Sequence, residues 1–393
     1  MLSETRTHHD RLTVLHLTQP VAGGVAQVVT DLVRAQTAQG LHVHLACPAE
    51  GPLARAGAGA GARVTEWAAR RELGAHVAGE VLRAARLVRR IKPDVVHAHS
   101  AKAGLAARLA LRGTVPTVYQ PHAWSFEAVQ GGAARLARHW ERLGARWAAR
   151  ILCVSEAERG AGERAGVGGA FRVIRNGVDL ARYTAALPAT GPRAADGAAE
   201  RSAPDGPLAV CVGRLCRQKG QDVLLSAWPA VRAALPAARL VFVGDGPDER
   251  ALRAQAAGDP SVTFAGASAD PRTWYAAADL VVLPSRWEGM ALAPLEAMAC
   301  GRPVLVTDVG GARESLPPGH AGHCLVAPAD PAALAGALRR LLPDAALRAR
   351  LGATGAAHVQ ASFDVAHTAA AVLDLYHDLL RTPVPAGRER VTR

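Results

Sequence analysis

The sequence predicts an α/β protein with two doubly wound parallel sheets arranged in tandem. With 393 residues, the chain is too long for one ordinary core and long enough for two domains of roughly 150 to 200 residues. Short runs of β-branched and aliphatic residues alternate with segments of helical period, which is typical of parallel sheets covered by helices on both faces. A stretch rich in proline and glycine interrupts this alternation once, and the alternation then restarts.

The first half begins with a strand, a glycine turn and a helix. Residues 12–17 form the apolar run and Gly23 and Gly24 the turn, and the helix is indicated by apolar side chains at helical spacing: Val25, Val28, Val29, Leu32 and Val33. The same reasoning predicts strands over residues 41–47, 94–99, 115–120, 151–155 and 171–174, with helices over 76–91 and 135–148. Residues 1–183 are therefore expected to form a first Rossmann-like domain.

Residues 184–207 are predicted to link the domains, because prolines and glycines stand there among alanines and charges without a periodic apolar face. Beyond them, strands are expected over residues 208–213, 239–244, 262–266, 280–283 and 303–307, and a helix over 222–235. A second Rossmann-like domain would cover residues 208–363. The last part, 364–393, holds a helical stretch over 365–380 that could pack back on the first domain. Doubly wound sheets bind ligands at the carboxyl ends of their strands, so the site is expected in the central cleft.

The composition argues against several classes of protein. The six cysteines are scattered without a Cys-x-x-Cys pair, so neither a zinc site nor a disulfide framework is expected. No apolar run approaches the roughly 20 residues of a spanning helix, so we expect a cytoplasmic protein. The net charge of +12 suits an anionic partner, but lysine occurs only at Lys92, Lys102 and Lys219, and an arginine-rich composition without selection for binding is the preferred explanation.

The densest group of functional candidates follows the predicted strand 280–283 and opens a helix. Pro294 suits the first helical turn, so the helix dipole and unpaired backbone N–H groups would face the cleft and bind a diphosphate. Those donors belong to Gly289, Met290, Ala291 and Leu292. Glu288 precedes the loop at the cleft rim and Glu296 is expected in the first helical turn, so the two carboxylates would meet different parts of one ligand.

Two cations follow the predicted strand 208–213. The guanidinium of Arg214 could hold phosphate oxygens with its fork, and Lys219 could act as a point charge. Together they would neutralise a nucleoside diphosphate as it leaves.

Histidines follow two predicted strands of the first half. His122 comes after strand 115–120, at the expected cleft edge, and His97 and His99 stand two apart at the end of strand 94–99. No matching cysteine or carboxylate spacing accompanies that pair, so packing and cleft lining are preferred over metal binding. The chain also lacks an Asp-x-Asp pair, which usually holds a divalent cation on a nucleoside diphosphate. The phosphates would then be bound by cationic side chains and backbone N–H groups alone.

These features occur in the order found in one family, and the series covers nearly the whole chain. It runs through residues 23–24, 93–99, 121–122, 153–155, 174–179, 213–220, 243–247 and the Glu-x7-Glu stretch 288–296. The chain thus resembles the retaining GT-B glycosyltransferases of family 4, also called group 1. The resemblance implies that Arg214 and Lys219 contact the diphosphate, Glu296 the ribose and Glu288 the donor sugar. It places His122 by the reacting centre and the loop at Gly23 and Gly24 in the cleft, on the acceptor side.

The resemblance also implies the reaction. A hexosyl group would pass from a UDP- or GDP-sugar to a glycan, lipid-linked or small-molecule acceptor, with retention, without a metal or other cofactor, in cell-envelope or polysaccharide biosynthesis. The leaving phosphate would help to take the acceptor proton, so no enzyme nucleophile is needed, and no carboxylate pair like that of retaining hydrolases is evident. Two departures stand out. Met290 and Ala291 replace the aromatic residue and glycine of many relatives, and Ala123 replaces the glycine that commonly follows the histidine.

Two other functions and one surface interaction were weighed. A nucleotide-sugar 2-epimerase shares this architecture, but acid and base residues for it are not evident. A noncatalytic protein for anionic polymers or nucleic acid is disfavoured by the 4% aromatic content, and no nucleic-acid partner is expected. Arginines of the first domain could rest on an anionic membrane at its inner face: Arg83, Arg86, Arg89, Arg90, Arg135, Arg138, Arg142 and Arg146.

Overall fold

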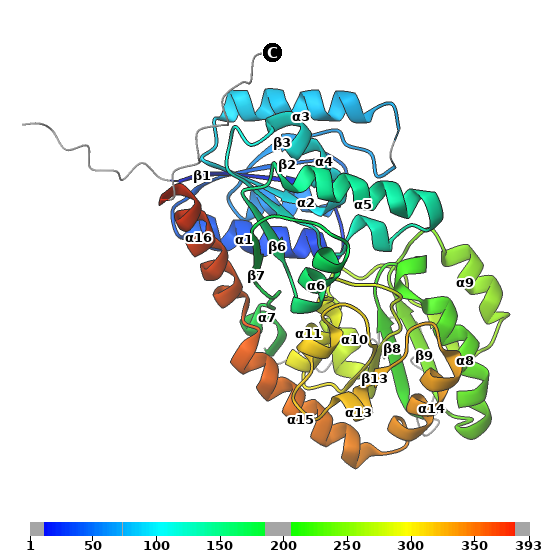
Figure 1. The fold of residues 1–393 in the computed structure, drawn as a ribbon. Coiled ribbons are helices and arrows are strands. Elements are labelled where there is room, and N and C mark those ends of the chain that lie inside the picture. Colours follow the sequence, from blue (N-terminus) through cyan, green and yellow to red (C-terminus); the bar gives the residue numbers. More distant parts are fainter. Residues whose placement is uncertain (1–11, 73, 185–205, 382–393) are drawn as a thin grey trace, which may run out of the picture.

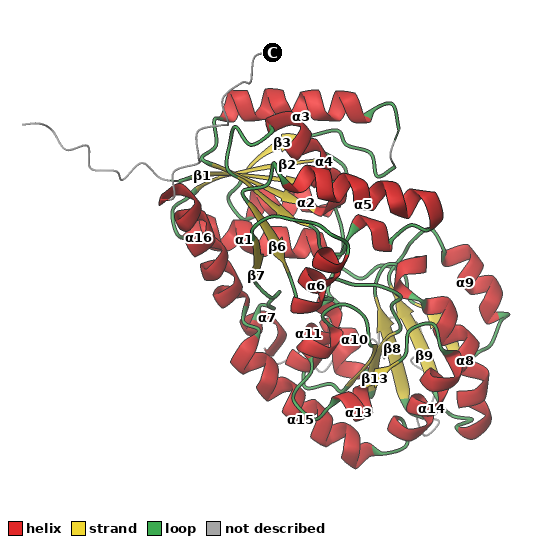
Figure 2. Ribbon diagram, viewed as in Figure 1, coloured by secondary structure: helices red, strands yellow, loops and turns green. Residues whose placement is uncertain are grey.

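The chain forms two parallel β-sheets, each covered by helices on both faces (Figures 1 and 2). The computed structural model describes residues 12–72, 74–184 and 206–381. Of the expected linker 184–207, residues 185–205 lie outside the described part. The predicted α/β architecture of two doubly wound sheets is confirmed.

The first sheet has seven strands in the order β3-β2-β1-β4-β5-β6-β7. Its strands are β1 Thr13–Thr18, β2 His42–Cys47, β3 Arg63–Glu66, β4 Val95–His99, β5 Thr117–Gln120, β6 Arg150–Cys153 and β7 Phe171–Val173. Its helices are α1 Gly24–Ala38, α2 Pro52–Gly59, α3 Val77–Ile91, α4 Ser100–Leu111, the 3₁₀ turn η1 Ser125–Glu127, α5 Gly131–Ala145, α6 Glu156–Arg164 and α7 Leu180–Thr184. Neighbouring β1 residues lie in cores on opposite faces, Val14 with α1 and Leu15 with α3 and α4.

The second sheet has six strands in the order β10-β9-β8-β11-β12-β13. Its strands are β8 Leu208–Val212, β9 Arg239–Val243, β10 Val262–Phe264, β11 Leu280–Leu283, β12 Val304–Thr307 and β13 Leu325–Val326. Its helices are the 3₁₀ turn η2 Arg217–Lys219, α8 Gln221–Ala234, α9 Glu249–Ala256, α10 Arg272–Ala277, α11 Leu292–Ala299, α12 Ala312–Ser315, α13 Ala321–Cys324, α14 Pro331–Leu341 and α15 Ala345–Ser362. One continuous core fills it, and Trp228, Tyr275 and Phe242 are its largest fully buried side chains.

Several predicted boundaries differ from those in the structure. The strands expected to reach residues 213, 244 and 266 end earlier, because Gly213, Gly244 and Gly266 adopt positive φ values of 156°, 142° and 75° and leave the extended conformation. The helix expected over 135–148 is α5, which begins and ends earlier, at Gly131 and Ala145.

The last helix, α16 (Val365–Arg381), returns the chain from the second sheet to the first (Figure 1). At the crossing, the N–H of Val178 donates to the carbonyl of Phe363 at 2.8 Å, and the N–H of Val365 donates to the carbonyl of Val178 at 3.0 Å. The buried face of α16 then packs against Val14 and Leu32 with the side chains of Ala369, Val372, Leu375, Tyr376 and Leu379. The core under α1 is thus completed by the end of the chain.

No helix in the described ranges combines the length and the apolar character that crossing a bilayer requires.

Candidate active site

The two domains contact each other at the loop that joins β11 to α11. The carbonyl of Gly289 accepts from Ser155 Oγ at 3.1 Å, and the carbonyl of Met290 accepts from Asn176 Nδ2 at 2.8 Å. Ser155 and Asn176 belong to the first domain, so the loop is held from across the junction. Among the described residues, no acceptor is found for the N–H groups of residues 290–292.

At the start of α11 the backbone is free to contact a ligand, because the side chains of Met290 and Leu292 are buried. Met290 packs into the core of the second domain, while Leu292 packs with the core between α1 and α16. Ala291, the N-cap of α11, offers no side-chain cap. The N–H groups that were proposed as diphosphate donors therefore retain their hydrogen-bonding capacity.

The start of α11 lies against the start of α1. A Cβ atom added to Gly24 would lie 3.9 Å from Leu292 Cδ1, and these two residues begin the two helices. The N-cap of α1 is Gly23 with φ 77°, and it also provides no side-chain cap. Two uncapped helix N-termini thus converge at the junction, and their dipoles favour a negatively charged ligand.

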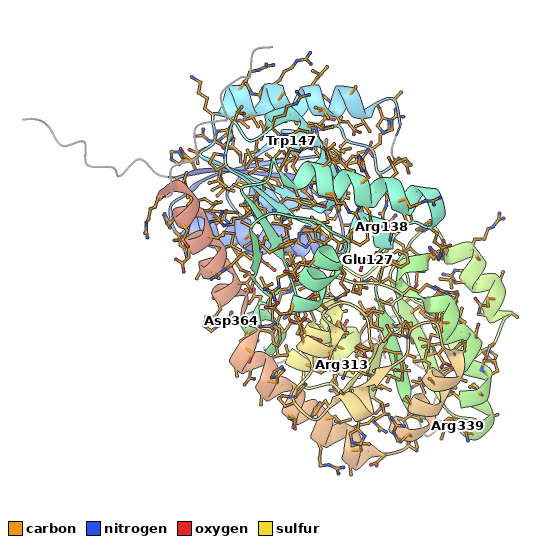
Figure 3. All side chains as sticks on the ribbon, in the orientation of Figure 1. Glu127, Arg138, Trp147, Arg313, Arg339 and Asp364 are labelled. Atoms are coloured by element: carbon orange, nitrogen blue, oxygen red, sulfur yellow. The ribbon has the colours of Figure 1, made fainter. Side chains whose placement is uncertain are left out.

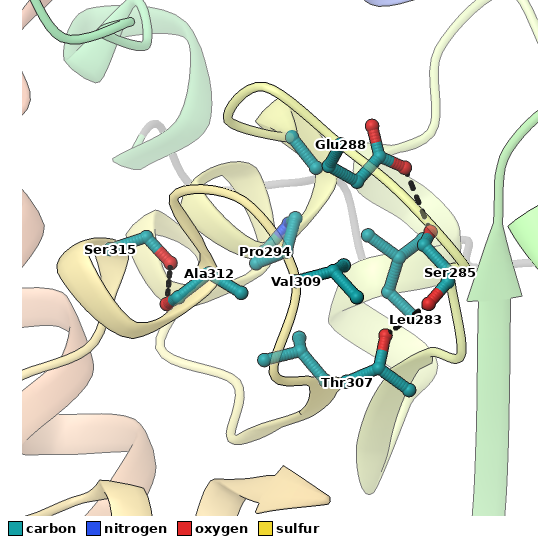
Figure 4. A pocket seen from close by; sticks show the side chains of 10 residues that line it. Leu283, Ser285, Glu288, Pro294, Thr307, Val309, Ala312 and Ser315 are labelled. Carbon is teal, nitrogen blue, oxygen red and sulfur yellow. Dashed lines mark hydrogen bonds between the residues drawn. The ribbon is translucent and has the colours of Figure 1, made fainter. Parts of the chain in front are cut away.

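A cation and a carboxylate pair directly beside this loop. Lys219 Nζ lies 2.6 Å from Glu288 Oε1, and Ser285 Oγ donates to the same oxygen at 2.7 Å. Thr307 Oγ1 in turn donates to the carbonyl of Ser285, as Figure 4 shows for the pocket that Glu288, Ser285 and Thr307 line. Arg214 follows β8 and is exposed. The predicted cations therefore border the predicted loop, with Lys219 and Glu288 in direct contact.

Glu296 differs from its predicted position. It is the fifth residue of α11, one turn later than the first-turn position expected, because the helix begins only at Leu292. Its side chain is buried, and the hydroxyl of Tyr275 donates to Oε2 at 2.7 Å. Burial raises the pKa of Glu296, and the Tyr275 hydrogen bond opposes that rise. The carboxyl is therefore held in place before any ligand binds.

His122 lies in a left-handed turn on the opposite side of the junction. Its φ is 57° and that of Ala123 is 110°, a conformation that favours glycine and is costly for alanine. The turn is held by Glu158, which accepts the N–H of Ala123 at 2.6 Å through Oε1 and the N–H of Val154 at 2.7 Å through Oε2. Burial raises the pKa of Glu158 to about 7. A buried carboxyl thus holds Ala123 in a backbone conformation that favours glycine.

The turn at His122 abuts the loop of the second domain. A Cβ atom added to Gly289 would lie 3.0 Å from the carbonyl carbon of His122, 3.0 Å from Glu158 Oε1 and 2.9 Å from Val154 Cγ2. The 2.9 Å distance is shorter than real Cβ contacts, and the two 3.0 Å distances are tighter than nine in ten of them, so a larger residue at this position would displace its neighbours. His122 and the Glu288–Gly289 segment are therefore brought together from opposite sides of the junction.

Three histidines gather behind His122. In the β1–β4 register His16 pairs with His97 and Thr18 with His99, and the period of two places His97 and His99 on one face. The three buried rings each offer a nitrogen, and these atoms lie within 4.8 Å of one another. His16 Nδ1 and His99 Nε2 are already hydrogen-bonded to each other at 2.9 Å. The sequence did not single out His16, although a central histidine in an apolar strand was a usable signal.

Three carboxylates near the junction were also missed. Glu127 of η1 accepts the N–H of Trp124 at 3.1 Å, and its pKa is raised first by burial and also by Glu288, so the two acids lie close enough to interact (Figure 3 labels Glu127). Glu314 of α12 accepts the N–H of Ala157 at 2.8 Å and pairs with Arg175 at 3.0 Å. Glu158 holds the His122 turn, as described above. None stands in a motif, and only the fold brings them to the junction.

Two doubly wound domains whose strand ends face each other, with cations and helix N-termini at the junction, define the GT-B class of protein. The description "Glycosyltransferase Family 4" matches residues 22–182, and "Glycosyl transferases group 1" matches residues 206–344. A Mycobacterium tuberculosis glycogen synthase is 32% identical over 300 residues, which cover 72% of this chain and 69% of that protein. The chain belongs to the group 1, family 4 type of glycosyltransferases.

Other relatives match over shorter stretches. A Corynebacterium glutamicum GDP-mannose-dependent monoacylated alpha-(1-6)-phosphatidylinositol monomannoside mannosyltransferase is 37% identical over 205 residues, 49% of this chain and 52% of its own length. The Rhizobium leguminosarum lipopolysaccharide core biosynthesis mannosyltransferase LpcC is 35% identical over 222 residues, 53% of this chain and 60% of its own length. This chain thus spans between half and two thirds of their lengths. The fold matches Anabaena HepE in complex with UDP-glucose, with a TM-score of 0.79, 24% identity, and coverage of 94% of this chain and 100% of that one.

Proposed function

We propose that the protein transfers a hexosyl group from a UDP- or GDP-sugar to a glycan, lipid-linked or small-molecule acceptor, with retention and without a metal ion, in cell-envelope or polysaccharide biosynthesis. The observation that carries this proposal is the convergence of the uncapped starts of α1 and α11 beside Lys219 and Glu288. Such a junction suits an anionic diphosphate with a polar sugar attached to it.

The proposed roles follow from the contacts. Lys219 would exchange Glu288 for a phosphate oxygen when the donor binds, and Arg214 would add a second cation from the end of β8. Both charges become more favourable as the leaving group ionises, so they act on the transition state. Glu288, released from Lys219, would face the sugar and stabilise positive charge that develops at the anomeric carbon. Glu296 would accept hydrogen bonds from the ribose.

The relatives support a donor of this class and an acceptor on a lipid or glycan. One relative's name specifies GDP-mannose and a phosphatidylinositol mannoside, two others the lipopolysaccharide core, and one solved neighbour is described with UDP-glucose. Which nucleotide this chain prefers is decided by donor screening.

The experiment that tests the proposal supplies UDP-, GDP- and ADP-hexoses to the purified protein and follows nucleotide release. Turnover with a UDP- or GDP-sugar is expected to persist in excess EDTA, because cations and backbone N–H groups meet the phosphates. The product's anomeric proton, observed by NMR, should show the configuration of the donor. An inverted product, or activity lost in EDTA and restored by Mg²⁺, would contradict the proposed chemistry.

For the acceptor side, we propose that the arginine face of the first domain contacts an anionic membrane. On α3, Arg86, Arg89 and Arg90 are exposed, and Arg135 and Arg142 on α5 and Arg146 at its C-cap are exposed as well. Arg138 of α5, labelled in Figure 3, is half-buried. Two aliphatic side chains project among them, Leu82 with 56% and Leu136 with 70% exposure. Cations around exposed aliphatic groups suit an anionic interface.

Binding to anionic liposomes should weaken as salt rises, since surface charges are screened over roughly 10 Å at 0.1 M ionic strength. Replacing Arg86 and Arg135 by serine should weaken the binding further. Replacing Arg250 and Arg339, exposed on the second domain, changes the net charge equally and should not. Equal binding to neutral and anionic vesicles, or equal effects of the two variants, would exclude the proposed face. Cosedimentation measures each case.

A further inference from the structure

A hydrogen-bonded chain of side chains runs from α1 through the first sheet to His122. Gln36 Oε1 lies 2.8 Å from His16 Nε2, His16 Nδ1 lies 2.9 Å from His99 Nε2, and His99 Nδ1 lies 3.1 Å from His122 Nε2. Gln36, His16 and His99 are each at most 1% exposed. Water therefore cannot replace these bonds, and each ring nitrogen depends on its neighbour.

The sheet itself places these rings in line. His16 is on β1 and His99 on the adjacent β4, and each ring stacks on the next, with centroids 5.2 Å apart for His16 and His99 and 5.4 Å apart for His99 and His122. Gln36 approaches from the last turn of α1, which covers that face. The positions are thus fixed by regular elements, while only His122 lies in a loop.

Donors and acceptors follow one direction along this series of hydrogen bonds. The oxygen of Gln36 can only accept, so His16 must carry its proton on Nε2 and accept at Nδ1. His99 then donates from Nε2 and accepts at Nδ1, and His122 must donate from Nε2. Burial lowers the pKa of His16 to about 4 and that of His122 to about 3, so all of these rings are neutral at pH 7.

We propose that Gln36, His16 and His99 are positioning residues that hold His122 as the Nε2–H tautomer, with Nδ1 free of a proton. A loop histidine in a strained turn would otherwise exchange tautomers and rotate, and the hydrogen bond made by one ring nitrogen determines which proton state the other presents. The consequence for turnover rests on the proposed function, because it assumes that His122 lies at the reacting centre. The tautomer does not depend on that assumption.

His97 provides a matched control. It is equally buried, and its ring stacks on His99 with centroids 4.0 Å apart. However, its Nδ1 bonds to the Tyr376 hydroxyl at 2.6 Å, and Tyr376 in turn interacts with Gln36. His97 is therefore linked only to the Gln36 end and makes none of the three hydrogen bonds between Gln36 and His122. Substitution of His97 should therefore disturb core packing about as much as substitution of His16 does, while it keeps the hydrogen bonds from Gln36 to His122.

The test observes ring nitrogens by NMR of the full-length protein labelled with ¹⁵N-histidine, with the His122 signals assigned from their loss in His122→Asn. We expect one tautomer in the parent protein, protonated at Nε2. Gln36→Met, which removes the terminal acceptor and keeps the side-chain length, and His16→Phe should both give a mixture of tautomers. His97→Phe should leave His122 unchanged. Protonation at Nδ1 in the parent, or a His122 spectrum that Gln36→Met does not alter, would overturn the proposal.

Measurements of kcat and KM then test whether the hydrogen bonds from Gln36 to His122 affect the reaction. Loss of one buried hydrogen bond is expected to lower kcat in Gln36→Met roughly three- to tenfold with KM for the donor nearly constant, whereas His97→Phe should keep kcat. If His122→Ala turns over normally, the role of His122 in the proposed function fails while the tautomer result stands. If Gln36→Met shifts the tautomer but kcat is unchanged, positioning for turnover is excluded.

Discussion

Exchange of Glu288 for glutamine is expected to lower kcat by about 10² or more while free UDP or GDP binds almost normally. The carboxylate stands beside the site proposed for the sugar, paired with Lys219 at 2.6 Å, and its charge would stabilise the developing positive centre in the transition state. Glutamine keeps the size of the side chain and its contact with Ser285 but removes that charge. Product release measures kcat, and calorimetry measures nucleotide affinity.

Glu296→Gln should give the opposite pattern, with weakened nucleotide binding and a smaller change in kcat. Its carboxyl is buried and already hydrogen-bonded to Tyr275, so it would contact the ribose equally in the ground and transition states. Ser285→Ala is the matched control for Glu288, because it removes the 2.7 Å bond to the carboxylate without removing charge. Loss of nucleotide binding in Glu288→Gln with retention in Glu296→Gln would reverse the assignment.

The free energy of unfolding should fall by several kcal/mol as the pH is lowered from 6.5 to 4. Burial holds the pKa of His16 at about 4 and that of His122 at about 3, and the pKa values of His97 and His99 are also well below the ordinary value. The unfolded chain then binds protons that the folded chain does not, so stability is full above pH 6.5 and is lost on acidification. His16 alone corresponds to about 3 kcal/mol at 1.36 kcal/mol per pKa unit. Urea titration across this range measures the slope.

The carboxyl of Glu158 opposes this loss of stability on acidification. Its pKa of about 7 is raised above the ordinary carboxyl value, so it contributes stability that is present below pH 4.5 and is lost as the pH rises through 7. Glu158→Gln removes that titration, so its stability should decline more steeply on acidification than that of the parent. A free energy of unfolding of Glu158→Gln that is level between pH 6.5 and 4 would contradict the low pKa values of the buried histidines, because this variant lacks the opposing titration of Glu158.

Much of the fold follows from local sequence pattern. Buried parallel strands appear as short aliphatic runs, so β1, β4, β8 and β11 were located to within a few residues. Helix α4 was not predicted, because alanine and leucine occur on all of its sides and give little helical period. Strand order and register depend on contacts between distant segments, and no local pattern encodes them.

In the candidate site, too, some residues could be predicted from local sequence and others depend on contacts between distant segments. Arg214, Lys219, Glu288 and the loop before α11 were predicted because each follows a strand end, where doubly wound sheets bind ligands. Glu158 and Gln36 could not be found in this way, since both lie on helices and acquire their roles only through contacts with distant residues. The start of α11 at Leu292 also depends on the packing of Leu292 across the junction, which moved Glu296 from the first turn to the second.

The return of α16 to the first sheet affects the order in which the protein can fold during synthesis. The first sheet is complete once Val173 has been made, but the apolar surface of Val14 and Leu32 is covered only by residues 369–379. At a ribosomal rate of 5–20 residues per second, the 206 further residues up to Leu379 take roughly 10–40 s. Throughout that interval the nascent first domain lacks the part of its core that α16 supplies, and the aliphatic surface beneath that helix stays exposed until the last helix emerges.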